Sequence, residues 1–227
     1  MTKYIAVLSG KGGVGKTTTA INLGFALNNI GRDVTVVDCF SSSLKDFLGL
    51  DVPLSLRNVT SGENHITEAT YIHPSGLKLV PSHITSLDHK KSISESLLGL
   101  YGKSDIVLLD GGSGYGSDVK DLLSLADEAI FISGPDEHSA KSIFPLIHVA
   151  EQLGVTFLGT VVNNHSNTRI KSSSLLKKSG IDPISTIPFD KNIQRSFSVN
   201  RTVLYCYPGS KSSIEYMKLA NLFWKNE

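Results

Sequence analysis

The chain has 227 residues, 40% of them hydrophobic, which is enough to bury one substantial core, so we expect a single domain over residues 1–227. Its 22 lysines and arginines against 21 aspartates and glutamates give a formal net charge of +1, which excludes a general attraction to nucleic acid or to an anionic membrane. The two cysteines, Cys39 and Cys206, are too far apart to indicate a disulfide framework, and the absence of a signal-peptide pattern and of an apolar run of roughly 18 residues leads us to expect a cytoplasmic protein.

Short β-branched runs alternate with segments of helical length along the chain. The predicted strands are 4–8, 34–37, 77–80, 106–109, 129–133, 156–162 and 184–187. The predicted helices are 17–29, 87–101, 118–126, 139–153 and 212–225. This alternation predicts an α/β fold of three layers, with a mostly parallel sheet flanked by helices and ligands at the carboxyl ends of the strands. Residues 41–75 fit the alternation least well, and we interpret them as a surface excursion.

The stretch "SGKGGVGKTT" at 9–18 contains the pattern G-x-x-x-x-G-K-[ST], directly after a predicted strand and at the start of a predicted helix. Glycines allow backbone N–H groups to converge on phosphate oxygens, while Lys16 reaches the β and γ phosphates and Thr17 offers its hydroxyl to Mg²⁺. The fold class is therefore a P-loop NTPase domain. The predicted nucleotide-binding residues here are Gly10, Lys11, Gly12, Gly13, Val14, Gly15, Lys16, Thr17 and Thr18.

Lys11 is not required by that general pattern. Its place in "KGGVGKT" resembles the deviant P-loop (Walker A) of the MinD/ParA family of dimerising ATPases, and archaeal MinD-like proteins are the most similar in length and in the segment 52–81. In that family the equivalent lysine reaches the nucleotide of the partner subunit. The resemblance therefore implies ATP or ADP as ligand, dimerisation on ATP binding, and catalytic roles for Lys11, Lys16 and Asp38; a homodimer and a heterodimer both remain open.

Three further segments carry the resemblance: "RDVTVVD", "SDIVLLDGGSG", and "VVNN" with "IPFD". They imply that Thr17, Asp38 and Asp110 surround Mg²⁺ and that Gly114 donates its N–H to the γ-phosphate. The residues implied to line the adenine are Asn163, Pro188, Phe189 and Asp190.

Two positions depart from the family pattern. The first switch of the family usually has two aspartates in the pattern D-x-D; here Asp38 is the first, and Phe40 stands at the place of the second. Phenylalanine can neither accept a proton nor orient water, so we expect slow hydrolysis. Gly112 replaces a proline in the second switch, residues 110–116, and gives that loop more backbone freedom. The group that orients the attacking water could instead come from Asp46, from residues 41–43 or from a partner protein, and these alternatives remain open.

The first hypothesis is an ATP-dependent dimerising switch that positions or regulates an unidentified partner. The alternative is a scaffold, or the silent half of a heterodimer, that holds ATP without turnover. We do not expect DNA binding, because the cluster of Arg169, Lys171, Lys177 and Lys178 is typical of a solvated helix face. We expect no direct membrane anchor, and we expect the histidines, His73, His83 and His89 among them, to lie on the surface without a metal.

Overall fold

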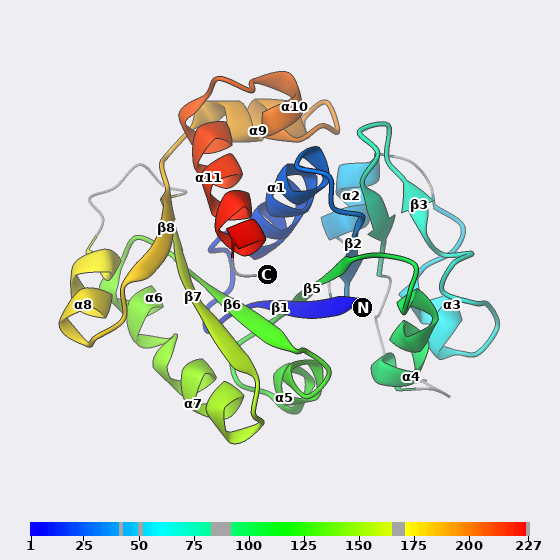
Figure 1. Ribbon diagram of the computed structural model, residues 1–227, viewed down its shortest axis with the longest axis horizontal. Helices are drawn as coiled ribbons and strands as arrows, with labels where there is room; N and C mark the ends of the chain where they lie inside the picture. Colours follow the sequence, from blue (N-terminus) through cyan, green and yellow to red (C-terminus); the bar gives the residue numbers. More distant parts are fainter. Residues whose placement is uncertain (41–42, 50–51, 83–91, 165–170, 226–227) are drawn as a thin grey trace.

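The computed structural model describes residues 1–40, 43–49, 52–82, 92–164 and 171–225. Within them, one eight-stranded sheet has the order β3-β4-β2-β5-β1-β6-β7-β8, and every neighbouring pair is parallel except β3 with β4 (Figure 1). The strands are β1 (Lys3–Ser9), β2 (Val34–Asp38), β3 (Tyr71–Ile72), β4 (Lys78–Val80), β5 (Ile106–Ser113), β6 (Glu128–Ser133), β7 (Thr156–Asn163) and β8 (Pro183–Ile187). The predicted α/β class and all seven predicted strands are confirmed, and β3 was missed.

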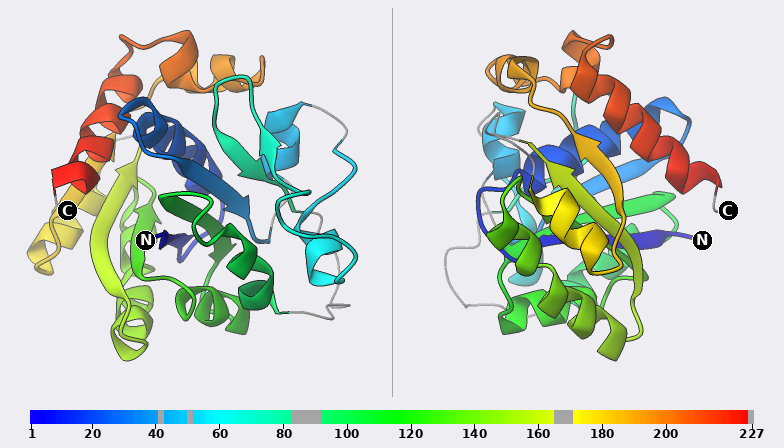
Figure 2. Two further views of the ribbon diagram at one scale, coloured as in Figure 1. Left: turned by 45° about the vertical axis from the view of Figure 1, so that its right-hand side comes forward. Right: turned by 90° about the vertical axis from the view of Figure 1, so that its left-hand side faces the viewer.

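Helices cover both faces of the sheet, so the three predicted layers are present. The helices are α1 (Lys16–Asn29), α2 (Ser43–Leu48), α3 (Leu56–Thr60), α4 (Ile93–Leu97), η1 (Leu98–Leu100), α5 (Ser117–Leu123), α6 (Glu137–Lys141), α7 (Phe144–Gln152), α8 (Ser172–Lys178), α9 (Lys191–Phe197), α10 (Val203–Cys206) and α11 (Lys211–Lys225). Figures 1 and 2 show α1 and α11 on one side of the sheet and α5 and α7 on the other. Along β1, Ile5 and Val7 pack into the core on the α1 face of the sheet, while Ala6 and Leu8 pack into the core on the α5 face, as the two-residue period of a strand requires.

The interpretation of residues 41–75 as a surface excursion was wrong. This segment contains α2, α3 and β3, and the side chains of Leu56, Val59 and Ile66 are buried in the core on the α5 face. Leu56 and Val59 are three residues apart, so both lie on the inner face of α3. The helix is only five residues long, too short for its periodicity to stand out in the sequence.

The helix predicted over 139–153 is two helices, α6 and α7, separated at Ser142 and Ile143. Pro145 lies in the first turn of α7, where its missing N–H and fixed φ favour a helix start over a helix interior. The break therefore has a local cause.

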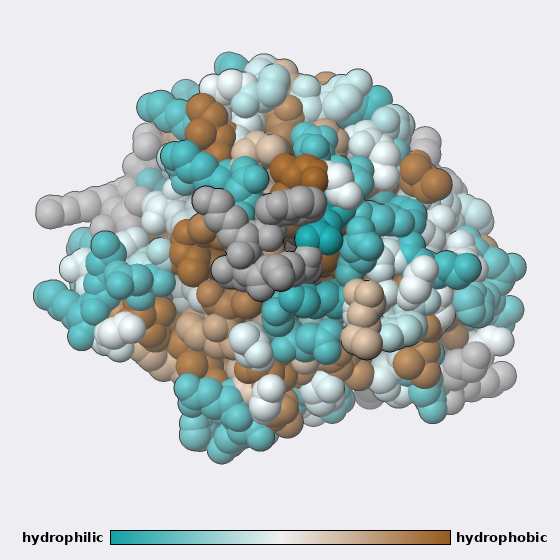
Figure 3. All heavy atoms as spheres, in the orientation of Figure 1, coloured by the Kyte–Doolittle hydropathy of each residue, from teal (hydrophilic) through white to brown (hydrophobic). Residues whose placement is uncertain are grey.

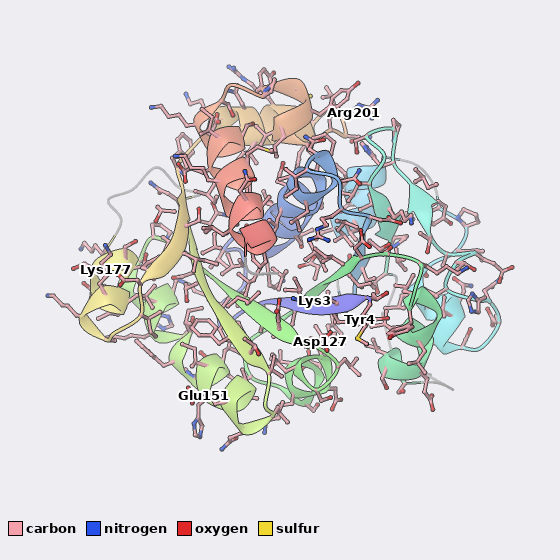
Figure 4. All side chains as sticks on the ribbon, viewed as in Figure 1. Lys3, Tyr4, Asp127, Glu151, Lys177 and Arg201 are labelled. Carbon is pink, nitrogen blue, oxygen red and sulfur yellow. The ribbon has the colours of Figure 1, made fainter. Side chains whose placement is uncertain are left out.

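Polar contacts fix the amino ends of the central strands. The backbone N–H of Tyr4 donates to Asp127 Oδ2 at 2.8 Å, and Lys3 Nζ lies 2.9 Å from Glu128 Oε1. Figure 4 shows Lys3, Tyr4 and Asp127 close together at this edge. The carboxyl ends of the parallel strands meet at the opposite edge, where the P-loop leaves β1.

Candidate functional site

The P-loop, residues 10–17, connects the end of β1 to the start of α1, as predicted. A Cβ atom on Gly10 would lie 2.1 Å from the carbonyl oxygen of Ser142, and one on Gly15 would lie 2.1 Å from Nδ2 of Asn163. Gly15 also has φ of 86°, a left-handed conformation that side chains rarely tolerate. Both glycines are therefore required by close packing behind the loop. No acidic side chain lies in the first turn of α1, so its positive end remains available to an anion.

A buried carboxylate lies directly beside the P-loop. Asp110, at the second switch, is 1% exposed; Thr17 Oγ1 donates to its Oδ2 at 2.5 Å, and Lys16 Nζ lies 3.6 Å from its Oδ1. Desolvation raises the pKa of the Asp110 carboxyl to about 6, against the opposing effects of Lys16 and Thr17 and with a further contribution from Asp38. The site thus keeps a carboxylate in a place where its charge is costly, and a bound cation would offset that cost.

The donor set fits Mg²⁺. Asp110 Oδ1 has no hydrogen-bond partner within the described residues, and Asp38, fully buried, is paired with Asp110 across β2 and β5. The described residues contain no group of three or more His, Cys, Asp or Glu that could hold a metal alone. Mg²⁺ commonly takes one or two carboxylates and completes its shell with water and phosphate, so such a group is not needed. Thr17 and Asp38 each lie beside Asp110, through a hydrogen bond and through strand pairing respectively.

The first switch has an apolar ring beside this cluster. Phe40 packs against the core on the α5 face, and its ring would lie 3.8 Å from a Cβ atom at Gly112, so it faces the second switch. Its backbone N–H donates to Asp38 Oδ1 at 3.3 Å, which orients the carboxylate without offering a group for water. Cys39 is fully buried, and burial raises the pKa of its thiol well above the ordinary value, so the thiol stays protonated.

Asp46 borders the P-loop from the α2 side. Its exposed carboxylate lines a cavity of about 280 Å³ between α1, α2 and α9. The other lining residues are Thr17, Thr18, Ile21, Ser43, Phe47 and Phe197. Ser43 is also here, whereas residues 41 and 42, proposed with it as substitutes for the missing aspartate, lie outside the described residues.

The second switch continues the sheet. β5 runs past Asp110 to Ser113, which pairs with Ser9 of β1, and the backbone N–H of Gly114 donates to the carbonyl of Ser9 at 2.9 Å. Gly114 has φ of 94°, which lets the chain turn away from the sheet. The next residue, Tyr115, donates its hydroxyl to the carbonyl of Ser142 at 3.0 Å. The N–H expected to meet a γ-phosphate is therefore engaged within the protein.

A second cavity of about 280 Å³ opens beside the first turn of α1, on the side predicted for the adenine. Its lining residues are Gly15, Thr18, Asn163, Asn164, Pro188, Phe189, Asp190, Lys191, Ile193, Gln194 and Phe197. All four residues predicted for the base are among them. Gln194 and Phe197 were not foreseen, because the seven-residue helix that carries them is too short to show a periodic pattern.

Two of those four residues also hold the protein itself together. Asn163 Nδ2 donates to the carbonyl of Val14 at 3.0 Å, and so supports the P-loop. Asp190 accepts from the backbone N–H of Asn192 at 2.9 Å and from Ser212 Oγ at 2.7 Å, which ties α9 to α11. Partial burial raises the pKa of Asp190, but these hydrogen bonds outweigh it and leave the pKa below its ordinary value.

Lys11 lies away from the buried cluster. Its side chain is 48% exposed, and Nζ is 3.9 Å from Oδ1 of Asp136, which is also at the surface. Hydrogen bonds from Ser139 lower the pKa of Asp136, so its carboxylate is ionised at neutral pH. This separates Lys11 from Lys16, which is 14% exposed and faces Asp110.

The histidine prediction was wrong for His73, which is 2% exposed and stacks on Phe47 at 5.1 Å between ring centroids. His83, His89 and Arg169 lie outside the described residues. Lys177 of the basic segment is at the outer edge of the molecule in Figure 4 and is 3.9 Å from Asp182.

On the face seen in Figure 3, hydrophilic residues separate smaller hydrophobic groups. Among the described residues, no helix is both long enough and apolar enough to cross a membrane.

The family described as the CobQ/CobB/MinD/ParA nucleotide binding domain matches residues 5–203. An ATP-binding protein of Methanocaldococcus jannaschii is 27% identical over 225 residues, covering 95% of this chain and 85% of that protein. The antiactivator FleN of Pseudomonas aeruginosa is 25% identical over 238 residues, covering 96% of this chain and 85% of that protein. The structure of the septum site-determining protein MinD from Pyrococcus horikoshii, complexed with Mg-ADP, has a TM-score of 0.88 at 26% identity and covers 98% of this chain and 96% of that one.

Proposed function

Because the chain belongs to the CobQ/CobB/MinD/ParA nucleotide-binding family, we propose that it is an ATP-binding switch that dimerises with ATP and regulates a partner protein. The observation that carries the proposal is the buried Asp110, whose Oδ1 has no hydrogen-bond partner within the described residues, beside Lys16 and Thr17 at the P-loop. A carboxylate in this position would serve as a ligand for Mg²⁺ that is bound together with a nucleotide.

In this proposal the P-loop N–H groups and Lys16 bind the phosphates, and Thr17, Asp38 and Asp110 hold Mg²⁺ directly or through water. When bound, Mg²⁺ would supply positive charge to the β- and γ-phosphate oxygens. The relative from Pyrococcus horikoshii, solved with Mg-ADP, supports this ligand pair. Asn163, Pro188, Phe189 and Asp190 form the base side of the site.

Lys11 is proposed to act on the nucleotide of a second subunit. Its exposed side chain, which lies 3.9 Å from Asp136 while Lys16 faces Asp110, supports a role outside its own phosphate site. We propose a homodimer first, with a heterodimer as the variant that the same geometry permits. The name of the relative FleN, an antiactivator, supports a regulatory target.

Hydrolysis is proposed to be slow, because the Phe40 ring occupies the place beside Asp38 and cannot accept a proton from water. The second candidate function, a scaffold that holds ATP without turnover, is favoured by the same residue. Phosphate release distinguishes the two. If the parent protein releases phosphate in the steady state and Phe40→Asp raises the rate by about 10²-fold or more, the slow switch is supported.

Dimerisation is tested by measuring molecular mass in solution by light scattering, without nucleotide, with ADP and with a non-hydrolysable ATP analogue. We expect a dimer only with the triphosphate, and we expect Lys11→Ala to abolish the dimer while nucleotide binding persists. Lys177→Ala, which removes another exposed lysine, is the matched control. A Lys11→Ala protein that still dimerises would show that the cross-subunit assignment is wrong.

A further inference from the structure

We infer that Tyr115 weakens the binding of a triphosphate at this site relative to a diphosphate, by holding the Gly114 N–H on the Ser9 carbonyl. The inference rests on the proposed nucleotide site and adds to it a positioning residue that belongs to this chain's own second switch. It depends on three contacts: the Ser9 to Ser113 pairing, the Gly114 to Ser9 hydrogen bond, and the hydrogen bond between Tyr115 and Ser142.

The first two contacts extend the sheet into the loop. Ser113 pairs with Ser9 after an irregularity in the β1 to β5 register, and Gly114 then donates to Ser9 at 2.9 Å. Ser9 is fully buried, so its carbonyl has little access to water as a competing donor. The loop is consequently held as a continuation of β5 along the end of β1.

The third contact reaches a rigid support. Ser142 is 7% exposed, its hydroxyl donates to the carbonyl of Ser139 at 2.7 Å, and its N–H donates to the carbonyl of His138 at 3.1 Å. Gly10, the first residue of the P-loop, packs so closely on Ser142 that a Cβ atom would lie 2.1 Å from the Ser142 carbonyl oxygen. Tyr115 therefore connects the second switch to the wall behind the P-loop, and its side chain, 44% exposed, spans the surface between them.

The Ser9 carbonyl and a phosphate oxygen would compete for the same hydrogen-bond donor, the Gly114 N–H. A phosphate oxygen that receives the Gly114 N–H must displace the Ser9 carbonyl, and the loop must leave the end of β1 to do so. ADP has no γ-phosphate and leaves the loop where it is. Any contact that holds the loop therefore weakens triphosphate binding and does not affect diphosphate binding.

The test is Tyr115→Phe, which keeps the ring and removes the hydroxyl, with Tyr101→Phe as control. Tyr101 is also exposed and precedes Gly102, whose N–H donates to Thr2 at the opposite end of β1 from the P-loop. We expect Tyr115→Phe to tighten binding of a non-hydrolysable ATP analogue by about two- to tenfold, the effect of one neutral hydrogen bond, and to leave ADP affinity unchanged. Equal changes for both nucleotides, or no change for either, would overturn the inference.

A second readout needs no nucleotide and so separates this inference from the proposed function. Hydrogen exchange of the Gly114 amide in the nucleotide-free protein should be slow in the parent and in Tyr101→Phe, and about two- to tenfold faster in Tyr115→Phe. If the parent binds neither nucleotide, the proposed function fails, while the exchange measurement still tests whether the hydrogen bond from Tyr115 to Ser142 holds the loop. If the Gly114 amide exchanges equally fast in the parent and in Tyr115→Phe, Tyr115 does not hold the loop, whatever the protein binds.

Discussion

Replacing Asp110 by asparagine should stabilise the nucleotide-free protein. The folded protein holds this carboxyl with a pKa of about 6, whereas the ordinary value is 3.8, so the unfolded chain ionises it more readily. The difference of about 2 pKa units, at about 1.4 kcal/mol per unit, means that the ionised Asp110 costs the folded state about 3 kcal/mol at pH 8. This figure already includes the attraction of Lys16 and the hydrogen bond from Thr17.

The sign of the pH dependence follows from the raised pKa. Well above pH 6 the carboxylate is ionised in both states and the full cost applies. As the pH falls through 6 toward 3.8, the folded protein takes up a proton before the unfolded chain does, so the cost shrinks to about half near pH 5 and vanishes below the unfolded value. The advantage of Asp110→Asn over the parent should shrink in the same way.

Urea unfolding of both proteins at several pH values between 5 and 8, without nucleotide or Mg²⁺, measures this difference. Asp182→Asn, at a carboxylate whose side chain is 87% exposed, is the control and should show no comparable gain. Adding Mg²⁺ and nucleotide should stabilise the parent and not Asp110→Asn. A variant that is less stable than the parent at pH 8, or a gain that does not shrink toward pH 5, would refute the argument that Asp110 is kept at the expense of stability.

Three further outcomes are expected. Gly15→Ala should lower the free energy of unfolding by about 1–3 kcal/mol and abolish nucleotide binding. Gly31→Ala, at a similar positive φ but with open space around it, should leave nucleotide binding intact. Thermal unfolding and nucleotide titration of the two variants measure these effects. Burial lowers the pKa of His73, so its contribution to stability should be lost as the pH falls below 6.5, and His73→Asn should flatten that part of the unfolding curve. A thiol reagent should modify Cys206 in the folded protein and Cys39 only after unfolding, which mass spectrometry of the modified peptides would show.

The parts of the site that could be predicted from the sequence are those set by short contiguous patterns. The P-loop is one uninterrupted motif between a strand and a helix. Asp38 and Asp110 each directly follow a predicted apolar strand, 34–37 and 106–109, so a parallel sheet was enough to bring them together. Lys11 could be singled out only through the resemblance to a family, because an exposed lysine has no pattern of its own.

The parts that could not be predicted depend on contacts between distant segments. Gly114 was expected to be free for a phosphate, but it donates to Ser9, a contact that depends on how far β5 continues along β1. Phe197 reaches the site from a helix of seven residues, and His73 is buried by packing with Phe47 from a separate segment. Short helices and local composition carry too little information to specify such tertiary contacts.

The interruption between α6 and α7 has an effect on the phosphate site that does not depend on any residue touching a phosphate. In an unbroken helix the Ser142 carbonyl would point along the axis and accept the N–H four residues ahead. Pro145 has no N–H for the Lys141 carbonyl and lies in the first turn of a new helix instead, and the Ser142 carbonyl, between the two helices, accepts the hydroxyl of Tyr115. A substitution of Pro145 that allowed one continuous helix would withdraw this acceptor, so the behaviour of the second switch is specified in part by a proline on a different element of the fold.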